Sequence, residues 1–211
     1  MHHSGNRDFK MTLRSFYDPT AAEAGCDEAG RGCLAGPVYA AAVIFPKDYH
    51  NKELNDSKKL TEKQRARMRE EIIRNAVSWS IASCSNTEID NMNILRASIT
   101  AMHRALDSLA GRPELLLIDG NRFYGYRNIP HITIVKGDAT FLSIAAASVL
   151  AKTERDRFME DLDEQFPVYG WKKNKGYPTR EHREAILKYG VTPWHRLTFS
   201  LHEMQTELQF L

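Results

Sequence analysis

The 211-residue sequence lacks several features that would assign it to a specialised class of protein. Its three cysteines are odd in number and do not show the paired spacing of zinc sites or disulfide frameworks. No apolar run approaches the roughly 18–20 residues of a membrane-spanning helix, and the N-terminus has no signal-peptide core. We therefore expect a cytoplasmic protein with free thiols and no membrane partner.

The chain also lacks a strong charge imbalance, with 29 Lys and Arg against 27 Asp and Glu and a formal net charge of +2 at pH 7. Affinity for nucleic acid would therefore depend on local basic patches. The clearest patch covers residues 168–196, which carry seven Lys and Arg against two Glu. We expect Trp171 and Trp194 of this segment in the core. Lys172 and Lys173 are as consistent with plain solvent exposure as with phosphate contacts.

Repeats, low-complexity tracts and clear linkers are absent too, and 42% hydrophobic and 27% charged residues are typical of one globular domain. After a polar lead-in over residues 1–20, apolar periodicity indicates strands and helices. The predicted strands cover 21–28, 36–46, 77–83, 114–118 and 129–135. The predicted helices cover 64–75, with a capping box at Thr61, a segment to about 109 that is capped by Asn86 or Thr87, and the chain from Phe141 onward. This order predicts an α/β domain with a mixed sheet.

The rest of the chain is arranged around residues 25–43, GCDEAGRGCLAGPVYAAAV. Asp27 and Glu28 are adjacent carboxylates at the end of a predicted strand, where neighbouring side chains point to opposite faces and cannot both be solvated surface charges. A buried carboxylate normally finds a cation or a metal. The following Gly30-Arg31-Gly32 lets the backbone approach a partner closely with its N–H groups exposed. Metal-assisted chemistry on a phosphodiester fits this pairing, and a strand end and turn without function is the alternative.

Two further carboxylates follow predicted strands. Asp119 comes directly after the apolar strand, and Asp138 lies between the last strand and the next helix. Ligands bind at strand ends in α/β sheets, so we expect both to converge with Asp27 and Glu28. Four carboxylates without a histidine cluster favour Mg²⁺ or Mn²⁺ over zinc. Taken singly, Asp119 is also consistent with a turn residue and Asp138 with a helix N-cap.

These residues belong to a series of short motifs over about residues 21–195. The motifs are Asp27-Glu28-Ala29-Gly30-Arg31-Gly32 with Gly36-Pro37, Asp56-Ser57-Lys58-Lys59-Leu60, Ile118-Asp119-Gly120-Asn121, Lys136-Gly137-Asp138 with residues 143–148, Ala151-Lys152 with Arg155-Asp156, and Gly176-Tyr177-Pro178-Thr179 with His182. In them the sequence resembles ribonuclease HII, the type 2 ribonuclease H family. The resemblance implies the ribonuclease H-like fold, a mixed five-stranded sheet flanked by helices. It also implies a catalytic domain over 21–165 and a basic, helical, substrate-contacting extension over 166–211.

The resemblance further implies an activity and a set of roles. The family hydrolyses the RNA strand of RNA–DNA hybrids and cuts 5′ of single ribonucleotides in duplex DNA, by two-metal catalysis that leaves 3′-OH and 5′-phosphate ends. Such an activity serves DNA repair and DNA replication, and we expect a monomer. By similarity, Asp27, Glu28, Asp119 and Asp138 ligate Mn²⁺ or Mg²⁺, Gly30-Arg31-Gly32 reads the ribose 2′-OH, Tyr177 stacks on the sugar of the next nucleotide, and Lys59 and Lys152 contact phosphates.

Other interpretations stay open at this point. Ribonuclease HIII shares much of the chemistry but usually has a long N-terminal substrate-binding domain, for which about 20 residues before the first strand leave no room. A non-catalytic binder would need metals to stop four carboxylates from repelling the DNA backbone. A phosphotransferase of the actin-like branch would need Gly-rich nucleotide loops, which we do not find. At the C-terminus, Gln205, Gln209 and Phe210-Leu211 loosely resemble a sliding-clamp-binding tail, although packing on the domain is the favoured interpretation.

Overall fold

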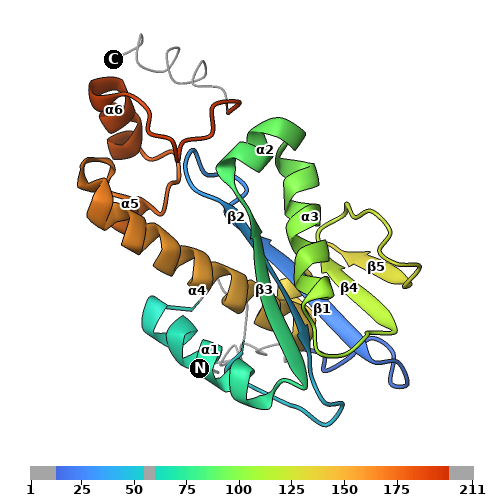
Figure 1. The fold of residues 1–211 in the computed structure, drawn as a ribbon. Coiled ribbons are helices and arrows are strands. Elements are labelled where there is room, and N and C mark those ends of the chain that lie inside the picture. Colours follow the sequence, from blue (N-terminus) through green and yellow to red (C-terminus); the bar gives the residue numbers. More distant parts are fainter. Residues whose placement is uncertain (1–12, 55–59, 200–211) are drawn as a thin grey trace, which may run out of the picture.

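The computed structural model describes residues 13–54 and 60–199, which fold around one mixed five-stranded sheet (Figure 1). The strands are β1 (Glu23–Ala29), β2 (Val38–Ile44), β3 (Ser78–Cys84), β4 (Leu115–Asp119) and β5 (His131–Ile134). The helices are α1 (Glu62–Asn75), α2 (Asn86–Met92), α3 (Ile94–Asp107), α4 (Leu142–Gln165), α5 (Trp171–Asn174) and α6 (Arg180–Tyr189), with short 3₁₀ helices η2 (Gly137–Ala139) and η3 (Pro167–Tyr169). The sheet order is β3-β2-β1-β4-β5, with β1, β2 and β3 antiparallel and β1, β4 and β5 parallel. Within the described residues, no helix has the length and apolarity to cross a membrane.

Helices cover both faces of the sheet. α4 packs over β1 and β2 with α1 against its outer side, and α3 packs over β2 and β3 on the opposite face (Figure 1). Side chains of β1 alternate between the two layers, and Ala24 and Cys26 join the core that α3 covers. A Cβ on Gly25 would stand 2.3 Å from the carbonyl carbon of Ser143 on α4. Glycine and the small residues of α4 therefore allow this helix to approach the strand closely.

The predicted helix over 86–109 is wrong in two respects, because the segment forms two helices and because Ser85, not the predicted Asn86 or Thr87, caps the first one. α2 begins after Ser85, whose hydroxyl accepts the N–H of Glu88 at 3.1 Å. The chain then turns at Asn93, which has a φ of 71° and accepts the N–H of Arg96 at 3.1 Å to cap α3. Asparagine tolerates positive φ and caps helices well, so a local cap competes successfully with a continuous helix. The predicted capping box at Thr61 is confirmed.

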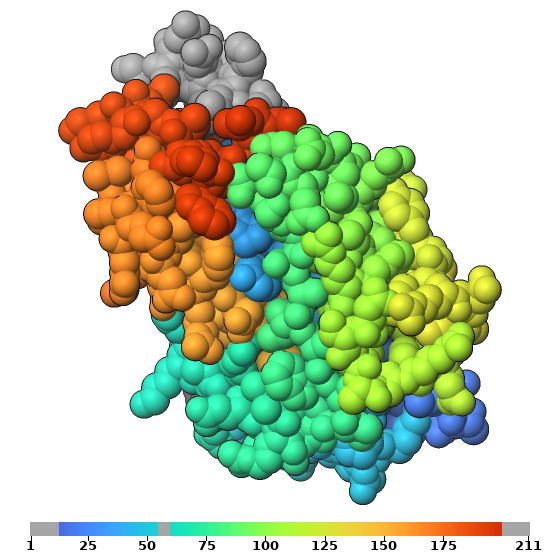
Figure 2. All heavy atoms as spheres, in the orientation of Figure 1, coloured from blue at the N-terminus to red at the C-terminus, as the bar shows by residue number. Residues whose placement is uncertain are grey.

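The C-terminal elements pack on the distal half of α4 (Figure 1). Trp171 of α5 is fully buried and belongs to a second core with Met159 of α4 and Leu34 of the β1–β2 connection. Trp194, also predicted in the core, is only partly buried and packs its ring edge on Phe158 at a centroid distance of 5.5 Å. In Figure 2, the orange and red C-terminal elements and the green α2–α3 region flank a strip of blue atoms from the N-terminal part of the chain. The second core thus attaches the C-terminal elements to the β1–β2 connection.

Candidate active site

The C-terminal ends of β1 and β4 lie side by side because these two strands pair in parallel. A cavity of about 440 Å³ opens at this edge of the sheet. Its lining consists of Asp27, Glu28, Ala29, Gly30, Arg31, Gly32, Asp119, Ser148, Lys152, Arg155, Asp156 and Tyr177. Three of the four predicted carboxylates, the whole predicted loop, one predicted lysine and the predicted tyrosine therefore share one site.

Asp27 is buried at the end of β1. Its Oδ1 accepts the N–H of Glu28 at 2.7 Å, and the side chain of Ser148 hydrogen-bonds to it. Burial raises the pKa of Asp27 well above its ordinary value, and the charges of Glu28 and Asp119 raise it further. Burial also raises the pKa of Glu28, although Arg31 lies 3.2 Å from its Oε1 and opposes the shift. Oxygen ligands crowded in this way fit a hard divalent cation, which stabilises their charged forms.

Asp119 ends β4 and is held by the turn that follows β5. Its Oδ1 accepts the N–H of Gly137 at 2.7 Å, and a Cβ on Gly137 would stand 2.6 Å from Cδ1 of Ile144. Asp138 is buried on η2 next to this glycine but does not line the cavity. Across 13–54 and 60–199, no three His, Cys, Asp or Glu side chains are gathered closely enough to hold a metal ion as they stand. The structure thus brings Asp27 near Asp119, and Asp138 as a ligand stays a prediction.

A buried arginine near the C-terminus orients the loop between β1 and β2. Arg196 donates from Nη2 to the carbonyl of Gly30 at 2.7 Å and from Nη1 to the carbonyl of Arg31 at 2.9 Å. Its Nε–H donates to the carbonyl of Gly36 at 2.9 Å. In a trans peptide the C=O of one residue and the N–H of the next point in opposite directions. The N–H groups of Arg31 and Gly32 are therefore directed away from Arg196, and these two exposed residues line the cavity.

A second buried arginine, Arg155 of α4, holds the neighbouring backbone. Its guanidinium donates to the carbonyls of Pro37, Lys175 and Ala35 at 3.0, 2.7 and 3.1 Å. Its side chain also fills the space beside Gly30, where a Cβ would stand 2.0 Å from Nε and φ is +94°. Sequence reasoning assigned no structural role to Arg155 or Arg196. A signal existed for Arg155, which continues the core-facing i, i+4 series between Ala151 and Met159.

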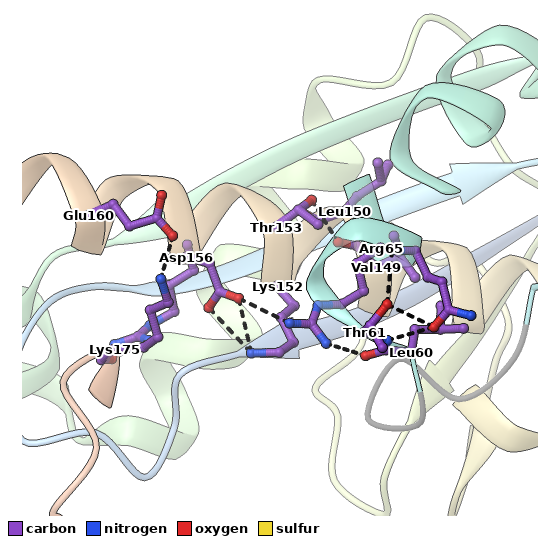
Figure 3. Close-up of polar contacts among 12 residues, drawn as sticks. Leu60, Thr61, Arg65, Val149, Leu150, Lys152, Thr153, Asp156, Glu160 and Lys175 are labelled. Carbon is purple, nitrogen blue, oxygen red and sulfur yellow. Dashed lines mark hydrogen bonds and ion pairs between the residues drawn. The ribbon is translucent and has the colours of Figure 1, made fainter. Parts of the chain in front are cut away.

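Lys152 lines the cavity with its ammonium group already engaged (Figure 3). It lies 3.3 Å from the carboxylate of Asp156, one turn further along α4. Arg65 of α1 lies 3.8 Å from the same carboxylate of Asp156. Arg65 also donates to the carbonyl of Leu60 at 2.6 Å. This network fixes the start of α1 beside the site. Lys59 lies outside the described residues, directly before Leu60, so its phosphate contact stays a prediction.

Tyr177 lies on the turn between α5 and α6 and lines the cavity with 41% of its surface exposed. The guanidinium of Arg155 is 5.9 Å from the centroid of the Tyr177 ring. The hydroxyl of Tyr177 and the thiol of Cys33 are hydrogen-bonded to each other. The preceding Gly176 packs so closely that a Cβ would stand 2.6 Å from the carbonyl oxygen of Ala35. The ring is thus held against the β1–β2 connection and offers an exposed aromatic surface to the cavity.

The basic segment is more engaged than its composition indicates. Lys175 forms an ion pair with Glu160 (Figure 3), and Lys173 lies 3.0 Å from Glu181. Each pair places an acidic group beside a lysine, which weakens its attraction for a phosphate. The segment therefore contributes less positive potential than a count of its lysines and arginines predicts.

A mixed five-stranded sheet in this order, with carboxylates at the ends of two adjacent strands, is the arrangement of the ribonuclease H-like fold. The solved ribonuclease H2 of Pyrococcus horikoshii OT3 superposes with a TM-score of 0.74 at 25% identity, covering 88% of this chain and 97% of that one. Archaeoglobus fulgidus RNase HII, solved in a PCNA complex, gives a TM-score of 0.71 at 25% identity over 86% and 96%. Bst-RNase HIII, solved in complex with Mn²⁺, gives 0.64 at 18% identity over 89% and 70%, and so supports the fold alone.

The chain belongs to the ribonuclease HII family, whose model matches residues 24–202. Ribonuclease HII of Bacteroides thetaiotaomicron is 64% identical over 189 residues, which are 90% of this chain and 94% of that protein. Ribonuclease HII of Parabacteroides distasonis is 60% identical over 198 residues, which are 94% and 100%. The chain is therefore a type 2 ribonuclease H, an endonuclease that acts on RNA–DNA hybrids. The predicted family and enzyme class are confirmed, and the non-catalytic and phosphotransferase interpretations are excluded.

Proposed function

We propose that this ribonuclease, besides hydrolysing the RNA strand of hybrids, cuts 5′ of a single ribonucleotide embedded in duplex DNA and leaves 3′-OH and 5′-phosphate ends. The observation that carries the proposal is the single cavity shared by Asp27, Glu28 and Asp119, by the loop donors and by Tyr177. The 2′-OH is the feature by which a protein tells RNA from DNA at one nucleotide. Two adjacent N–H groups beside the carboxylates suit that hydroxyl.

The proposed cofactors are two divalent cations, Mg²⁺ or Mn²⁺, held by Asp27, Glu28, Asp119 and Asp138. The raised pKa values of Asp27 and Glu28 support this, because a bound cation offsets the burial and mutual repulsion that disfavour their ionised forms. When bound, such metals supply an activated water and stabilise the leaving 3′-oxygen in an in-line displacement. The chain's own groups orient the ligands, Ser148 at Asp27 and the N–H of Gly137 at Asp119.

The recognition part of the proposal assigns the N–H groups of Arg31 and Gly32 to the 2′-OH and the ring of Tyr177 to the sugar of the following nucleotide. Arg196 supports the first role because its bonds turn the loop carbonyls away from the cavity. Contacts of Lys152 and of Lys59 with phosphates add affinity that is blind to sequence. Together these contacts place the cut at an RNA–DNA junction.

In this proposal, the metal ligands belong to a catalytic domain over 21–165. The aromatic contact belongs to the extension from residue 166. Tyr177 and Arg196 both come from this extension and reach the β1–β2 connection. The proposed substrates are RNA–DNA hybrids and ribonucleotide-containing duplex DNA, and the proposed acting form is a monomer. A role in removing ribonucleotides during DNA replication and repair in the cytoplasm follows from that substrate.

The test is cleavage of an end-labelled DNA duplex with one ribonucleotide, a long RNA–DNA hybrid and an all-DNA duplex, each with Mg²⁺, Mn²⁺ or EDTA. We expect one cut 5′ of the ribonucleotide with either metal, cleavage of the hybrid, and no product in EDTA or from DNA alone. A cyclic phosphate end would contradict the metal-activated water. Cleavage of the hybrid without cleavage of the embedded ribonucleotide would contradict junction recognition.

A contact between the C-terminal tail and a sliding clamp is a second proposal. The tail lies outside the described residues, and the support is its Gln205 and Phe210-Leu211 together with the PCNA complex solved for the Archaeoglobus fulgidus relative. Deleting residues 204–211 should abolish binding to the immobilised clamp of the same organism while cleavage of short duplexes is unchanged. Unaltered clamp binding with a lower Tm would support packing of the tail on the domain instead.

A further inference from the structure

The C-terminal extension contains a buried histidine pair that the proposed chemistry does not use. His182 and His195 are 0% and 3% exposed, and their Nε2 atoms are 3.3 Å apart. The indole N–H of Trp171 donates to Nε2 of His182 at 2.9 Å. Neither histidine lines the cavity, yet Nδ1 of His182 lies 2.9 Å from the carbonyl oxygen of Tyr177, the aromatic residue that does.

Two backbone groups determine where the histidine protons sit. The carbonyl of Tyr177 can only accept, so His182 carries its proton on Nδ1 and leaves Nε2 as an acceptor. The N–H of Thr192 can only donate, so His195 accepts it at Nδ1 at 2.9 Å and carries its own proton on Nε2. That proton is directed at Nε2 of His182, whose single lone pair it shares with the closer indole N–H of Trp171. The result is a one-way chain of hydrogen bonds, here called the relay, from Thr192 through His195 and His182 to the carbonyl of Tyr177.

The relay requires both rings to be neutral. A second proton on His182 would face the N–H of Trp171 and the Nε2–H of His195, and a second proton on His195 would face the N–H of Thr192. In agreement, burial lowers the pKa of both histidines, that of His195 to about 4. Tyr169 packs its ring 5.0 Å from that of His195 and donates its hydroxyl to a carbonyl, so it brings no charge.

The relay is part of a tight turn around Tyr177. The carbonyl of Tyr177 accepts a second bond from the N–H of Thr179 at 2.8 Å, and its own N–H donates to the carbonyl of Asn174 at 2.9 Å. His182 is also tied to this turn through its N–H, which donates to the Thr179 hydroxyl at 3.2 Å. The backbone on both sides of the ring is thus fixed, and His182 is the member that links it to the buried C-terminal core.

We infer that His182 is a positioning residue for Tyr177, and that the relay sets the preference of the enzyme for a single embedded ribonucleotide over a long hybrid. The inference rests on the proposed function, in which the ring of Tyr177 lies against the sugar after the ribonucleotide. A long hybrid offers many registers, so a displaced ring costs less there. A single ribonucleotide offers one register and depends on the ring being in place.

The experiment measures kcat/KM on a duplex with one ribonucleotide and on a long hybrid, and takes their ratio for each folded variant. His182→Leu removes the relay, and His182→Asn keeps a donor for the carbonyl of Tyr177. Tyr169→Phe is the matched control, because it removes only a hydroxyl that donates to the carbonyl of Gly190 in the same core. We expect His182→Leu to lower the ratio roughly 5-fold or more, the lower end for a lost stacking contact. His182→Asn should retain most of the ratio, and Tyr169→Phe should leave it unchanged.

Amide hydrogen exchange over residues 174–179 reports the same positioning without any substrate. We expect exchange in this turn to be roughly tenfold faster in His182→Leu than in Tyr169→Phe, because one of its anchoring bonds is lost. The double variant with Tyr177→Ala should show the ratio of Tyr177→Ala alone, since both changes act through one ring. If the leucine variant does not fold, His195→Phe keeps the aromatic packing, breaks the relay one bond earlier, and should show the same fall.

An unchanged ratio in folded His182→Leu, or an equal fall in Tyr169→Phe, would overturn the inference. Failure of the proposed function has a different result, namely equal losses for Tyr177→Ala on both substrates. In that case the role of the relay in substrate preference would fail together with the proposed function. Unchanged amide hydrogen exchange over residues 174–179 in His182→Leu would instead overturn the role of His182 in positioning Tyr177.

Discussion

At the residue scale, Asp27 illustrates the conflict between burial and charge that a metal site resolves. Its carboxylate is buried, faces two other carboxylates and has a raised pKa, so the folded protein without a cation is destabilised by its ionised form. We predict that Asp27→Asn abolishes cleavage while its Tm in EDTA equals or exceeds that of the wild type. Asp161→Asn, an exposed position on α4, is the control and should keep full activity. Residual cleavage by Asp27→Asn over a metal titration would contradict the assignment.

The effect of Asp27→Asn on the unfolding free energy should also depend on pH. The pKa of Asp27 in the folded state lies above its ordinary value of 3.8, so the folded state binds more protons than the unfolded state as the pH rises past this value. The stability that protonated Asp27 contributes is present at low pH and is lost as the pH rises through the raised pKa. In EDTA, the unfolding free energy of Asp27→Asn minus that of the wild type should therefore grow from pH 4 upward, as measured by urea denaturation. A difference independent of pH would be evidence against the raised pKa.

Gly30 and Gly32 both lie in the β1–β2 connection, but their surroundings are opposite. A Cβ on Gly30 would meet Arg155 at 2.0 Å at a φ of +94°, whereas one on Gly32 would meet no atom within 4 Å. We predict that Gly30→Ala lowers the Tm, and that Gly32→Ala keeps the Tm but lowers kcat/KM on both substrates because its methyl group occupies the substrate side. Thermal melts and cleavage rates of both variants check this. Normal rates in Gly32→Ala would show that substrate does not approach this residue closely.

At the element scale, the carbonyls of the β1–β2 connection are held by arginines from elsewhere in the chain. Arg196 satisfies three loop carbonyls, and a lysine cannot reproduce this fork of donors. We predict that Arg196→Lys lowers the unfolding free energy by roughly 2–5 kcal/mol, because buried carbonyls lose their partners. The folded fraction should also cut an embedded ribonucleotide more slowly than the wild type.

Arg180→Lys is the matched control for this prediction. Arg180 is an exposed arginine of the same C-terminal extension that pairs with Glu184 at 2.8 Å, so its replacement should have little effect on stability and leave cleavage unchanged. Equal effects of the two substitutions in urea denaturation would show that Arg196 acts through charge alone and not through the loop carbonyls.

At the scale of the whole molecule, stability depends on the attachment of the C-terminal extension, whose core contains two neutral histidines. The pKa of His195 is about 4 when folded against an ordinary value of 6.5, so the unfolded state binds more protons between these values. The stability linked to neutral His195 is thus fully present above about 6.5 and is lost as the pH falls toward 4. We predict that the unfolding free energy of the wild type minus that of His195→Gln rises over this window by up to ~1.4 kcal/mol per pH unit. A flat difference would place His195 in contact with water.

The sequence by itself determined most of the local structure and the identity of the chemistry. Strand and helix positions follow from apolar periodicity over a few residues, and capping at Thr61 follows from one short motif, so neither needs distant information. The exception, the break at Asn93, arose because one residue's cap competes with an equally plausible continuous helix. Asp27, Glu28 and Asp119 could be selected because carboxylates at strand ends are costly without a function.

Only the tertiary structure decided how the recognition side of the site is held together. Arg155 and Arg196 bind loop carbonyls that lie 120 and 166 residues away, and His182 pairs with a histidine whose role depends on the backbone of Thr192. Such contacts are made by buried backbone groups, which every residue carries, and therefore leave no pattern in the side-chain sequence. A charged residue in a basic segment looks the same in the sequence whether it faces solvent or a carbonyl. Its role depends on which surfaces the fold brings into contact.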